Sequence, residues 1–199
     1  MSQLSYEKVI SPTIAGEKIH YGIIYGNEKV VFIKAGYLGN IRGYEDKYLR
    51  IASRLHERLG ATVICASNPD ADYDAQVAAD KEMIEQVVAA AGFADYQVYL
   101  LGTSDGGYQN LLLAKAIPQT VKFLGINPSQ SSFPDLTKKL QNLAHVEKHL
   151  VYGTKDELYN QVQALQTLEC ANLETLTVEG ADHEFTGKVE EFIALTDFL

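Results

Sequence analysis

The stretch that decides the fold is Leu100-Leu101-Gly102-Thr103-Ser104-Asp105-Gly106-Gly107-Tyr108. It places a G-x-S-x-G pattern between an apolar, strand-like run and a segment with helical spacing. Glycines on both sides of a serine permit a sharp, strained turn, where a larger side chain would collide with neighbouring backbone. The pattern predicts that Ser104 projects from a strand end at the start of a helix. A helix cap with closely packed glycines would produce the same motif, so the pattern alone leaves both interpretations open.

Strand-like and helix-like patterns alternate on both sides of this turn. Alternation from Ile19 to Tyr25 and an apolar run from Val30 to Ile33 predict two strands, which the turn residues Gly26-Asn27 would join into a hairpin. We expect Asp74 to cap the second helix. Further strands are expected at 61–66, 98–101, 121–126, 149–152 and 173–178, and helices at 44–59, 74–91, 108–116, 135–143, 158–168 and 189–199. Such alternation predicts a three-layer α/β/α sandwich with a mostly parallel sheet.

Composition narrows the class of protein further. The 199 residues are 46% hydrophobic and 22% charged, which favours a single domain over residues 1–199. A net charge of −9 without a basic stripe argues against a nucleic-acid partner. Residues 1–8 lack the basic start and apolar run of a secretory signal, and no run is long enough to span a bilayer, so we expect a cytoplasmic protein with no membrane partner. Cys65 and Cys170 have neither metal-ligand nor redox spacing and are interpreted as packing residues.

Two further strand ends carry the groups that a serine nucleophile needs. Gly153-Thr154-Lys155-Asp156 places a carboxylate just past one expected strand, and Gly180-Ala181-Asp182-His183 places an imidazole past the next. A serine hydroxyl needs a base to take its proton, and the base needs a carboxylate to fix its tautomer. Since ligands bind beyond the carboxyl ends of such strands, we expect Ser104, Asp156 and His183 to meet there.

Together these motifs resemble the α/β-hydrolase family, in which the nucleophile, the acid and the histidine follow in this chain order. The resemblance extends from about Ile19 to the C-terminus. It implies Ser104 as the nucleophile, His183 as the general acid and base, and Asp156 as the residue that orients His183. It also implies the α/β-hydrolase fold.

The resemblance extends to a second loop. Acyl transfer needs backbone donors aimed at the oxyanion of the intermediate. One would be the amide of Asp105, the residue after the nucleophile. The other would come from the loop after Ile33, with the Tyr37 amide as first candidate and Gly36 as second. This loop resembles the family's His-Gly-aromatic loop, with Ala35 in place of the histidine.

The substrate class follows from what the chain can accommodate near the site. The stretch between Ile126 and Leu150 is too short for a cap domain, and residues 127–134 are typical of a loop. We therefore expect a lidless serine hydrolase that cleaves a small soluble ester, thioester or lactone through an acyl-enzyme on Ser104, without a cofactor. A non-catalytic ligand- or partner-binding protein of the same fold, and an acyltransferase or amidase with the same triad, remain alternatives. The sequence does not determine the oligomeric state.

Two clusters of potential metal ligands depart from the spacing of known metal sites. His145 and His149 stand four residues apart but lack the glutamate of a zinc-protease helix and run into a strand. The acidic run at 70–74 begins like a calcium loop, but Ala75 replaces the required glycine and Lys81 stands at the position of the bidentate glutamate. We therefore expect no metal site.

The carboxylates beside the expected site have two interpretations each. In the first interpretation, the Asp105 carboxylate stabilises the N-terminus of its helix electrostatically. In the second, it disfavours anionic substrates and attracts cationic ones. Asp182 and Glu184 flank His183. They are either surface charges or carboxylates that raise the pKa of His183. The sequence leaves both choices open.

Overall fold

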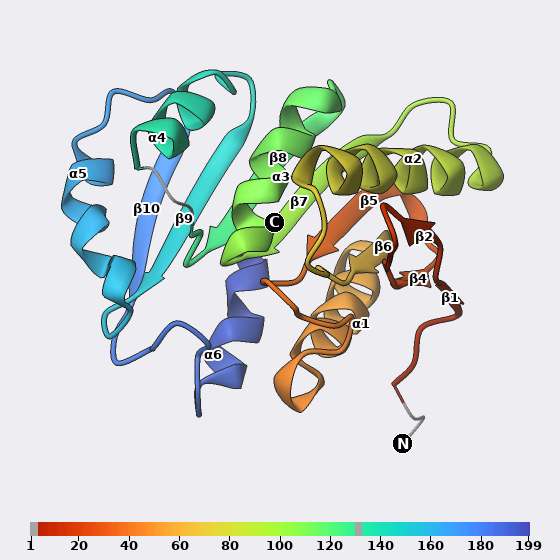
Figure 1. Cartoon of the computed structure of the whole chain (residues 1–199), viewed down its shortest axis with the longest axis horizontal. Helices are drawn as coiled ribbons and strands as arrows, with labels where there is room; N and C mark the ends of the chain where they lie inside the picture. The colour runs from red at the N-terminus through yellow and green to blue at the C-terminus, as the bar shows by residue number, and fades with distance from the viewer. Residues whose placement is uncertain (1–3, 130–132) are drawn as a thin grey trace.

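The computed structural model describes residues 4–129 and 133–199, and its centre is an eight-stranded sheet (Figure 1). The strand order is β1-β4-β6-β5-β7-β8-β9-β10. Strands from β6 to β10 in this order pair in parallel, whereas β4 is antiparallel to both β6 and β1. The expected mostly parallel sheet is thus confirmed. The strands are β1 (Lys8–Ile10), β4 (Tyr21–Ile24), β5 (Asn27–Lys34), β6 (Ala61–Ala66), β7 (Gln97–Thr103), β8 (Thr120–Ile126), β9 (Glu147–Gly153) and β10 (Leu173–Val178), and β2 (Thr13–Ile14) pairs separately with β3 (Glu17–Lys18).

Helices cover both faces of the sheet, which confirms the three-layer prediction (Figure 1). One face packs against α2 (Tyr73–Ala91), α3 (Asp105–Ala116), α4 (Phe133–Gln141) and α5 (Val162–Gln166), and the other against α1 (Lys47–Leu59) and α6 (Val189–Ala194). Short 3-10 helices are η1 (Tyr44–Asp46), η2 (Glu157–Gln161) and η3 (Leu195–Phe198). Within the described residues, no helix combines the length and apolar character that crossing a membrane requires.

Alternating side chains of the central strands hold the three layers together. Phe32 of β5 and Leu100 of β7 belong to the apolar cluster under α2 and α3. Their neighbours Ile33 and Leu101 belong to the cluster under α1 and α6. Because successive strand residues point to opposite faces, a strand covered on both sides reads as a continuous apolar run. This pattern explains why the central strands could be predicted from the sequence.

The expected hairpin at Gly26-Asn27 is wrong. β4 and β5 do not pair, because β6 lies between them and hydrogen-bonds to both. The Gly26-Asn27 link passes tightly beneath the start of β6: a Cβ on Gly26 would lie 2.2 Å from the Gly60 carbonyl oxygen, and the Asn27 amide donates to that oxygen at 2.7 Å. The glycine therefore serves a crossing of two chain segments and not a two-residue turn.

The helix ends agree with the expected stop signals better than the starts do. α1 and α2 end at Gly60 and Gly92, both in the left-handed conformation that favours glycine. The cap of α2 is Asp72, whose side chain accepts from the Ala75 amide at 2.9 Å, so the expected cap at Asp74 is wrong. Asp74 lies inside the first turn, where a carboxylate still interacts favourably with the helix N-terminus.

The connection from β8 to β9 contains a single helix, α4, in the part of the chain that the structure describes. No cap domain is therefore inserted in the described part of this connection. Part of the loop expected at 127–134 can be traced at 127–129, but residues 130–132 lie outside the described residues.

Candidate active site

The strand order places a crevice at the carboxyl edge of β5 and β7. From β5 the chain passes through α1 to β6 on one side, and then through α2 to β7 on the other side of β5. Loops that leave two adjacent strands toward opposite faces of a sheet form a crevice, which is the usual place for a ligand. The loop after β5 carries Gly36 and Tyr37, and Ser104 follows β7.

Ser104 occupies the sharp turn that its flanking glycines predict. Its backbone is strained, with φ of 51° and ψ of −126°. A Cβ on Gly102 would lie 2.4 Å from the Gly106 carbonyl oxygen, and a Cβ on Gly106 would lie 2.2 Å from the Ala35 carbonyl oxygen. No larger residue fits at either position without backbone movement, so Gly102 permits the turn itself and Gly106 permits the close approach of the loop after β5.

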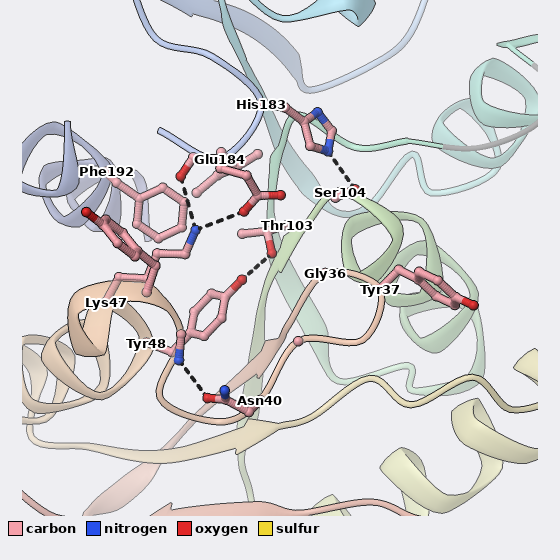
Figure 2. A pocket seen from close by; sticks show the side chains of 14 residues that line it. Gly36, Tyr37, Asn40, Lys47, Tyr48, Thr103, Ser104, His183, Glu184 and Phe192 are labelled. Carbon is pink, nitrogen blue, oxygen red and sulfur yellow. Dashed lines mark hydrogen bonds and ion pairs between the residues drawn. The ribbon is translucent and has the colours of Figure 1, made fainter. Parts of the chain in front are cut away.

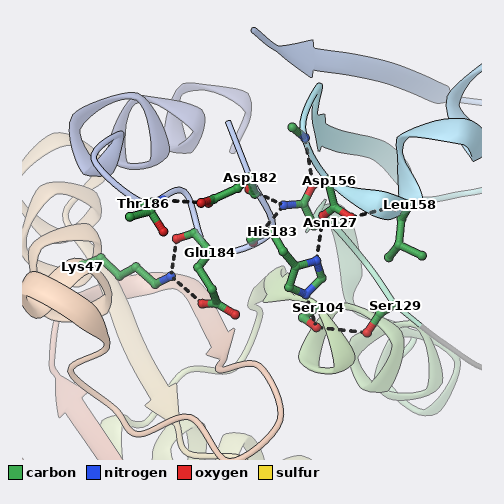
Figure 3. A network of polar contacts seen from close by, with 11 residues as sticks. Lys47, Ser104, Asn127, Ser129, Asp156, Leu158, Asp182, His183, Glu184 and Thr186 are labelled. Carbon is green, nitrogen blue, oxygen red and sulfur yellow. Dashed lines mark hydrogen bonds and ion pairs between the residues drawn. The ribbon is translucent and has the colours of Figure 1, made fainter. Parts of the chain in front are cut away.

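The structure brings the three predicted catalytic side chains into one hydrogen-bonded chain (Figure 3). The Nε2 atom of His183 lies 2.8 Å from the Oγ of Ser104, and its Nδ1 lies 2.7 Å from the Oδ2 of Asp156. The Asp156 side chain is fully buried, and its Oδ1 accepts from the Leu158 amide at 2.7 Å. Because an ionised carboxylate only accepts, Nδ1 carries the proton and Nε2 is left to accept one from Ser104.

Asn127, which follows β8, ties the acid loop to the histidine loop (Figure 3). Its buried amide nitrogen donates to the backbone oxygens of His183 at 2.9 Å and Asp182 at 3.3 Å, and its oxygen accepts from the Gly153 amide at 2.9 Å. Sequence reasoning missed this residue. Its only signal was an asparagine at a strand end, in a chain where strand ends carry the chemistry.

Ser129 is a second residue that the sequence did not reveal. Its Oγ lies 3.0 Å from the Oγ of Ser104, and its amide donates to the Ser104 carbonyl oxygen at 3.2 Å. The nucleophile candidate therefore has two side-chain partners, His183 on one side and Ser129 on the other (Figure 3). The second contact holds the hydroxyl in place without offering a base.

The proposed oxyanion donors lie on the loops beside Ser104. Asp105 is the first residue of α3, where a backbone amide has no acceptor within the helix. In the loop after β5, the Gly39 amide donates to the Gly36 oxygen at 2.8 Å. Asn68 supports this loop where Ala35 lacks a polar side chain, because its Nδ2 donates to the Ala35 oxygen at 3.2 Å. The oxyanion role of these amides stays a prediction.

Tyr48 lies near the loop that carries Gly36 and Tyr37. Burial raises the pKa of Tyr48 to about 12, and hydrogen bonding from Thr103 and the Gly36 amide acts in the opposite direction. The Tyr48 hydroxyl also lies 2.6 Å from the Oγ1 of Thr103. The choice between the Tyr37 and Gly36 amides as the second oxyanion donor stays a prediction.

The carboxylate of Asp105 is held by side chains and is almost completely buried. It accepts hydrogen bonds from the amide nitrogens of Asn68 and Gln109, both at 2.9 Å, and from the Tyr73 hydroxyl. Burial and the nearby Asp105 raise the pKa of Tyr73, so Tyr73 remains a donor. These contacts favour the interpretation of Asp105 as a structural residue over its interpretation as a substrate filter.

A pocket of about 380 Å³ opens beside Ser104 and His183 (Figure 2). Its wall includes Lys47, whose Nζ lies 3.6 Å from the carboxylate of Glu184. Asp182 does not share this arrangement: its carboxylate accepts from the Thr186 amide at 2.8 Å, and that hydrogen bond lowers the pKa of Asp182. Of the two acids that flank His183, only Glu184 therefore lines the pocket.

Metal ligands do not converge anywhere in residues 4–129 and 133–199: no group of three or more His, Cys, Asp or Glu side chains is arranged to hold an ion.

Comparison with family models and with curated proteins finds no match to the sequence. Solved structures do match. A protein of unknown function from Agrobacterium tumefaciens superimposes with a TM-score of 0.76 at 16% identity, covering 96% of this chain and 94% of that one. An alpha-beta serine hydrolase homologue from Coxiella burnetii gives 0.74 at 16% identity and 98% of both chains. A dienelactone hydrolase from Anabaena variabilis gives 0.73 at 16% identity, with 98% and 97% covered. At this identity the likeness establishes the fold, and the chain has the α/β-hydrolase fold.

Proposed function

We propose that the protein is a serine hydrolase that cleaves a small carboxylic ester, thioester or lactone through an acyl-enzyme on Ser104. The observation that carries this proposal is the hydrogen-bonded chain from Ser104 through His183 to Asp156, at 2.8 Å and 2.7 Å. Its support from fold comparison is coarser: the neighbours include a serine hydrolase homologue and a dienelactone hydrolase.

The first half of the reaction forms the acyl-enzyme. The Oγ of Ser104 attacks the acyl carbon while Nε2 of His183 takes the hydroxyl proton. The carbonyl oxygen becomes an oxyanion, which the amides of Asp105 and Tyr37 would stabilise. The intermediate then collapses, the bond to the leaving group breaks, and His183 returns the proton to that group.

Water completes the second half by the same route. His183 takes a proton from the water, whose oxygen attacks the acyl carbon, and the released proton returns to Ser104 as the acid leaves. Asp156 stabilises the imidazolium that forms in each half. Its burial strengthens this interaction, because a charge pair is screened less away from water.

The size of the pocket supports a small substrate. About 380 Å³ lies at the lower end of the range for small-molecule sites. The described part of the connection between β8 and β9 adds one helix and no cap over Ser104. An open, small pocket favours a short acyl group over a long aliphatic chain.

A graded panel of p-nitrophenyl esters tests this function. We expect wild-type protein to hydrolyse short acyl esters fastest, and an acyl adduct on Ser104 to be detectable by intact mass spectrometry after rapid acid quench. The Ser104→Ala variant should lose about three orders of magnitude in kcat or more. Wild-type rates in Ser104→Ala would eliminate the proposal.

A further inference from the structure

Lys47 places a buried ammonium group in the wall of the pocket that holds Ser104 and His183 (Figure 2). It is the first residue of α1, and its side chain is only 4% exposed. Its Nζ lies 4.7 Å from the ring centre of Phe192 and 5.5 Å from that of Tyr48. A lysine side chain is almost never buried to this degree unless another group pairs with its ammonium.

The protein satisfies this ammonium group incompletely. Nζ donates one hydrogen bond, to the backbone oxygen of Glu184 at 3.2 Å. The Glu184 carboxylate lies 3.6 Å away, which is an ion pair beyond hydrogen-bond length. An ammonium carries three donors, so in the described part of the chain two of them have no hydrogen-bond acceptor. Desolvation lowers the pKa of Lys47, and the nearby Glu184 and Asp182 carboxylates act in the opposite direction.

Glu184 is the exchangeable member of this pair. Its side chain is 72% exposed, whereas that of Lys47 is buried. The Glu184 carboxylate is already largely hydrated, so it loses few contacts when it turns further into water. A carboxylate on a bound ligand could therefore take its place beside Nζ and form the hydrogen bonds that Glu184 does not.

We propose that Lys47 is a specificity-determining residue that binds a carboxylate on the substrate, so that the preferred substrates are small esters bearing a second, free carboxylate, such as half-esters of dicarboxylic acids. This inference rests on the proposed function, since it names the substrate class of the same site. Glu184 occupies the position of the substrate carboxylate when the pocket is empty.

A purely structural role for Lys47 makes a different prediction. Its bond to the Glu184 backbone ties α1 to the loop that carries His183, so losing it could misplace the base. Misplacement of His183 would slow charged and neutral esters by the same factor. Loss of a carboxylate partner would slow the charged ester selectively.

The test compares monoethyl succinate, glutarate and adipate with the corresponding neutral diethyl esters. The measured quantity is the ratio of kcat/KM for each half-ester to that for its diester. In Lys47→Met, which keeps an unbranched apolar stem, we expect this ratio to fall about tenfold or more. Lys81→Met is the matched control, because it removes the same charge from the half-exposed surface of α2 and should leave the ratio unchanged. A ratio that stays constant in Lys47→Met overturns the inference.

Glu184→Gln tests the same idea from the other side and does not depend on Lys47→Met folding. Its side chain is largely exposed, so the substitution leaves packing intact. Removing the competing carboxylate should raise the half-ester ratio several-fold. An unchanged or lower ratio in this variant contradicts the exchange between Glu184 and the substrate.

Binding to a Ser104→Ala background separates the two proposals. Isothermal titration with the half-esters should show tighter binding than with the diesters, and Lys47→Met should abolish that difference. Selective binding without any wild-type hydrolysis would overturn the proposed function and retain the carboxylate site. Hydrolysis by the wild type with equal binding of both ester classes would retain the function and overturn the carboxylate site.

Discussion

Two histidines contact carboxylates at opposite edges of the same sheet. His183 follows β10 at the carboxyl edge and lies between Ser104 and the buried Asp156. His149 lies near the amino end of β9, with Nε2 at 2.9 Å from Glu147 and Nδ1 at 3.1 Å from Glu174. Each imidazole hydrogen-bonds to one carboxylate, His183 to Asp156 and His149 to Glu147, so the presence of an acid partner does not distinguish them.

The difference lies in what the second ring nitrogen meets. His183 offers one nitrogen to an acceptor and the other to a hydroxyl, so it can take a proton from that hydroxyl. His149 hydrogen-bonds through Nε2 to the Glu147 carboxylate, and its Nδ1 lies near the Glu174 carboxylate without forming a hydrogen bond, so neither nitrogen meets a hydroxyl. The carboxylates also differ, because Asp156 is fully buried whereas Glu147 and Glu174 are about half exposed. Of these two imidazoles, that of His183 connects a buried carboxylate to a hydroxyl.

Replacing each histidine in turn should have the largest effect. His183→Ala removes the proposed base, and we expect kcat for p-nitrophenyl acetate to fall about a thousandfold or more. His149→Ala should retain the wild-type rate within about twofold, since His149 contacts no residue of the candidate site. Stopped-flow rates and thermal melts of both variants measure this. Equal losses of kcat in His183→Ala and His149→Ala would contradict the distinction between the two histidines.

Replacing one acid at each edge sharpens the comparison. Asp156→Asn keeps the volume but lets the amide donate, so His183 is held in the wrong tautomer and kcat should fall by about three orders of magnitude or more. Glu174→Gln is the control and should leave kcat within about twofold. A near-normal kcat in Asp156→Asn, measured on folded protein, would show that the buried acid does not orient the base.

The backbone at the carboxyl edge should tolerate less change than open positions elsewhere. A methyl group at Gly106 meets the Ala35 carbonyl oxygen at 2.2 Å, so Gly106→Ala should cost about 1–3 kcal/mol of unfolding free energy and slow hydrolysis by moving the oxyanion loop. Gly92→Ala meets no atom within 4 Å and carries only the strain of φ at 72°, about 1 kcal/mol. Urea titrations of both variants compare these costs, and the reverse order would contradict this packing argument.

The smallest expected effect is on the unfolding free energy, when Glu147 at the amino end of β9 is replaced. Hydrogen bonds from His149 and Lys122 lower the pKa of Glu147, so its contribution to stability is present above its unfolded pKa of about 4.3 and is lost as pH falls through the folded value. Its half-exposed side chain limits this contribution to under about 1 kcal/mol. Glu147→Gln should therefore be slightly less stable at pH 7, and the two unfolding curves should converge at low pH. A stability difference between Glu147→Gln and the wild type that grows as the pH falls would contradict this prediction.

The sequence predicts the local chemistry better than the chain path. Ser104, Asp156 and His183 each follow a strand whose hydrophobic pattern is visible in isolation, as a continuous apolar run in β7 and as alternation in β10, and the parallel sheet then brings them together. The pairing of β4 was missed because the turn residues Gly26-Asn27 specify a bend and not the strand that will lie beside it. The extent of one domain and a cytoplasmic location stay predictions.

Residues whose role depends on contacts between remote segments could not be predicted. Asn127 and Ser129 appear as ordinary loop residues until the histidine loop and Ser104 lie beside them. Lys47 appears as a polar residue in the first turn of an amphipathic helix, yet the histidine loop and Phe192 bury it. Burial of a charged side chain is a tertiary property that periodicity does not encode.

Labelling with a fluorophosphonate probe tests most directly whether Ser104 is an activated nucleophile. We expect one adduct per chain, mapped to Ser104 by peptide mass spectrometry, absent in Ser104→Ala, strongly slowed in His183→Ala, and formed at the wild-type rate in His149→Ala. No adduct on folded wild-type protein, or an adduct that forms equally fast without His183, would contradict the serine hydrolase.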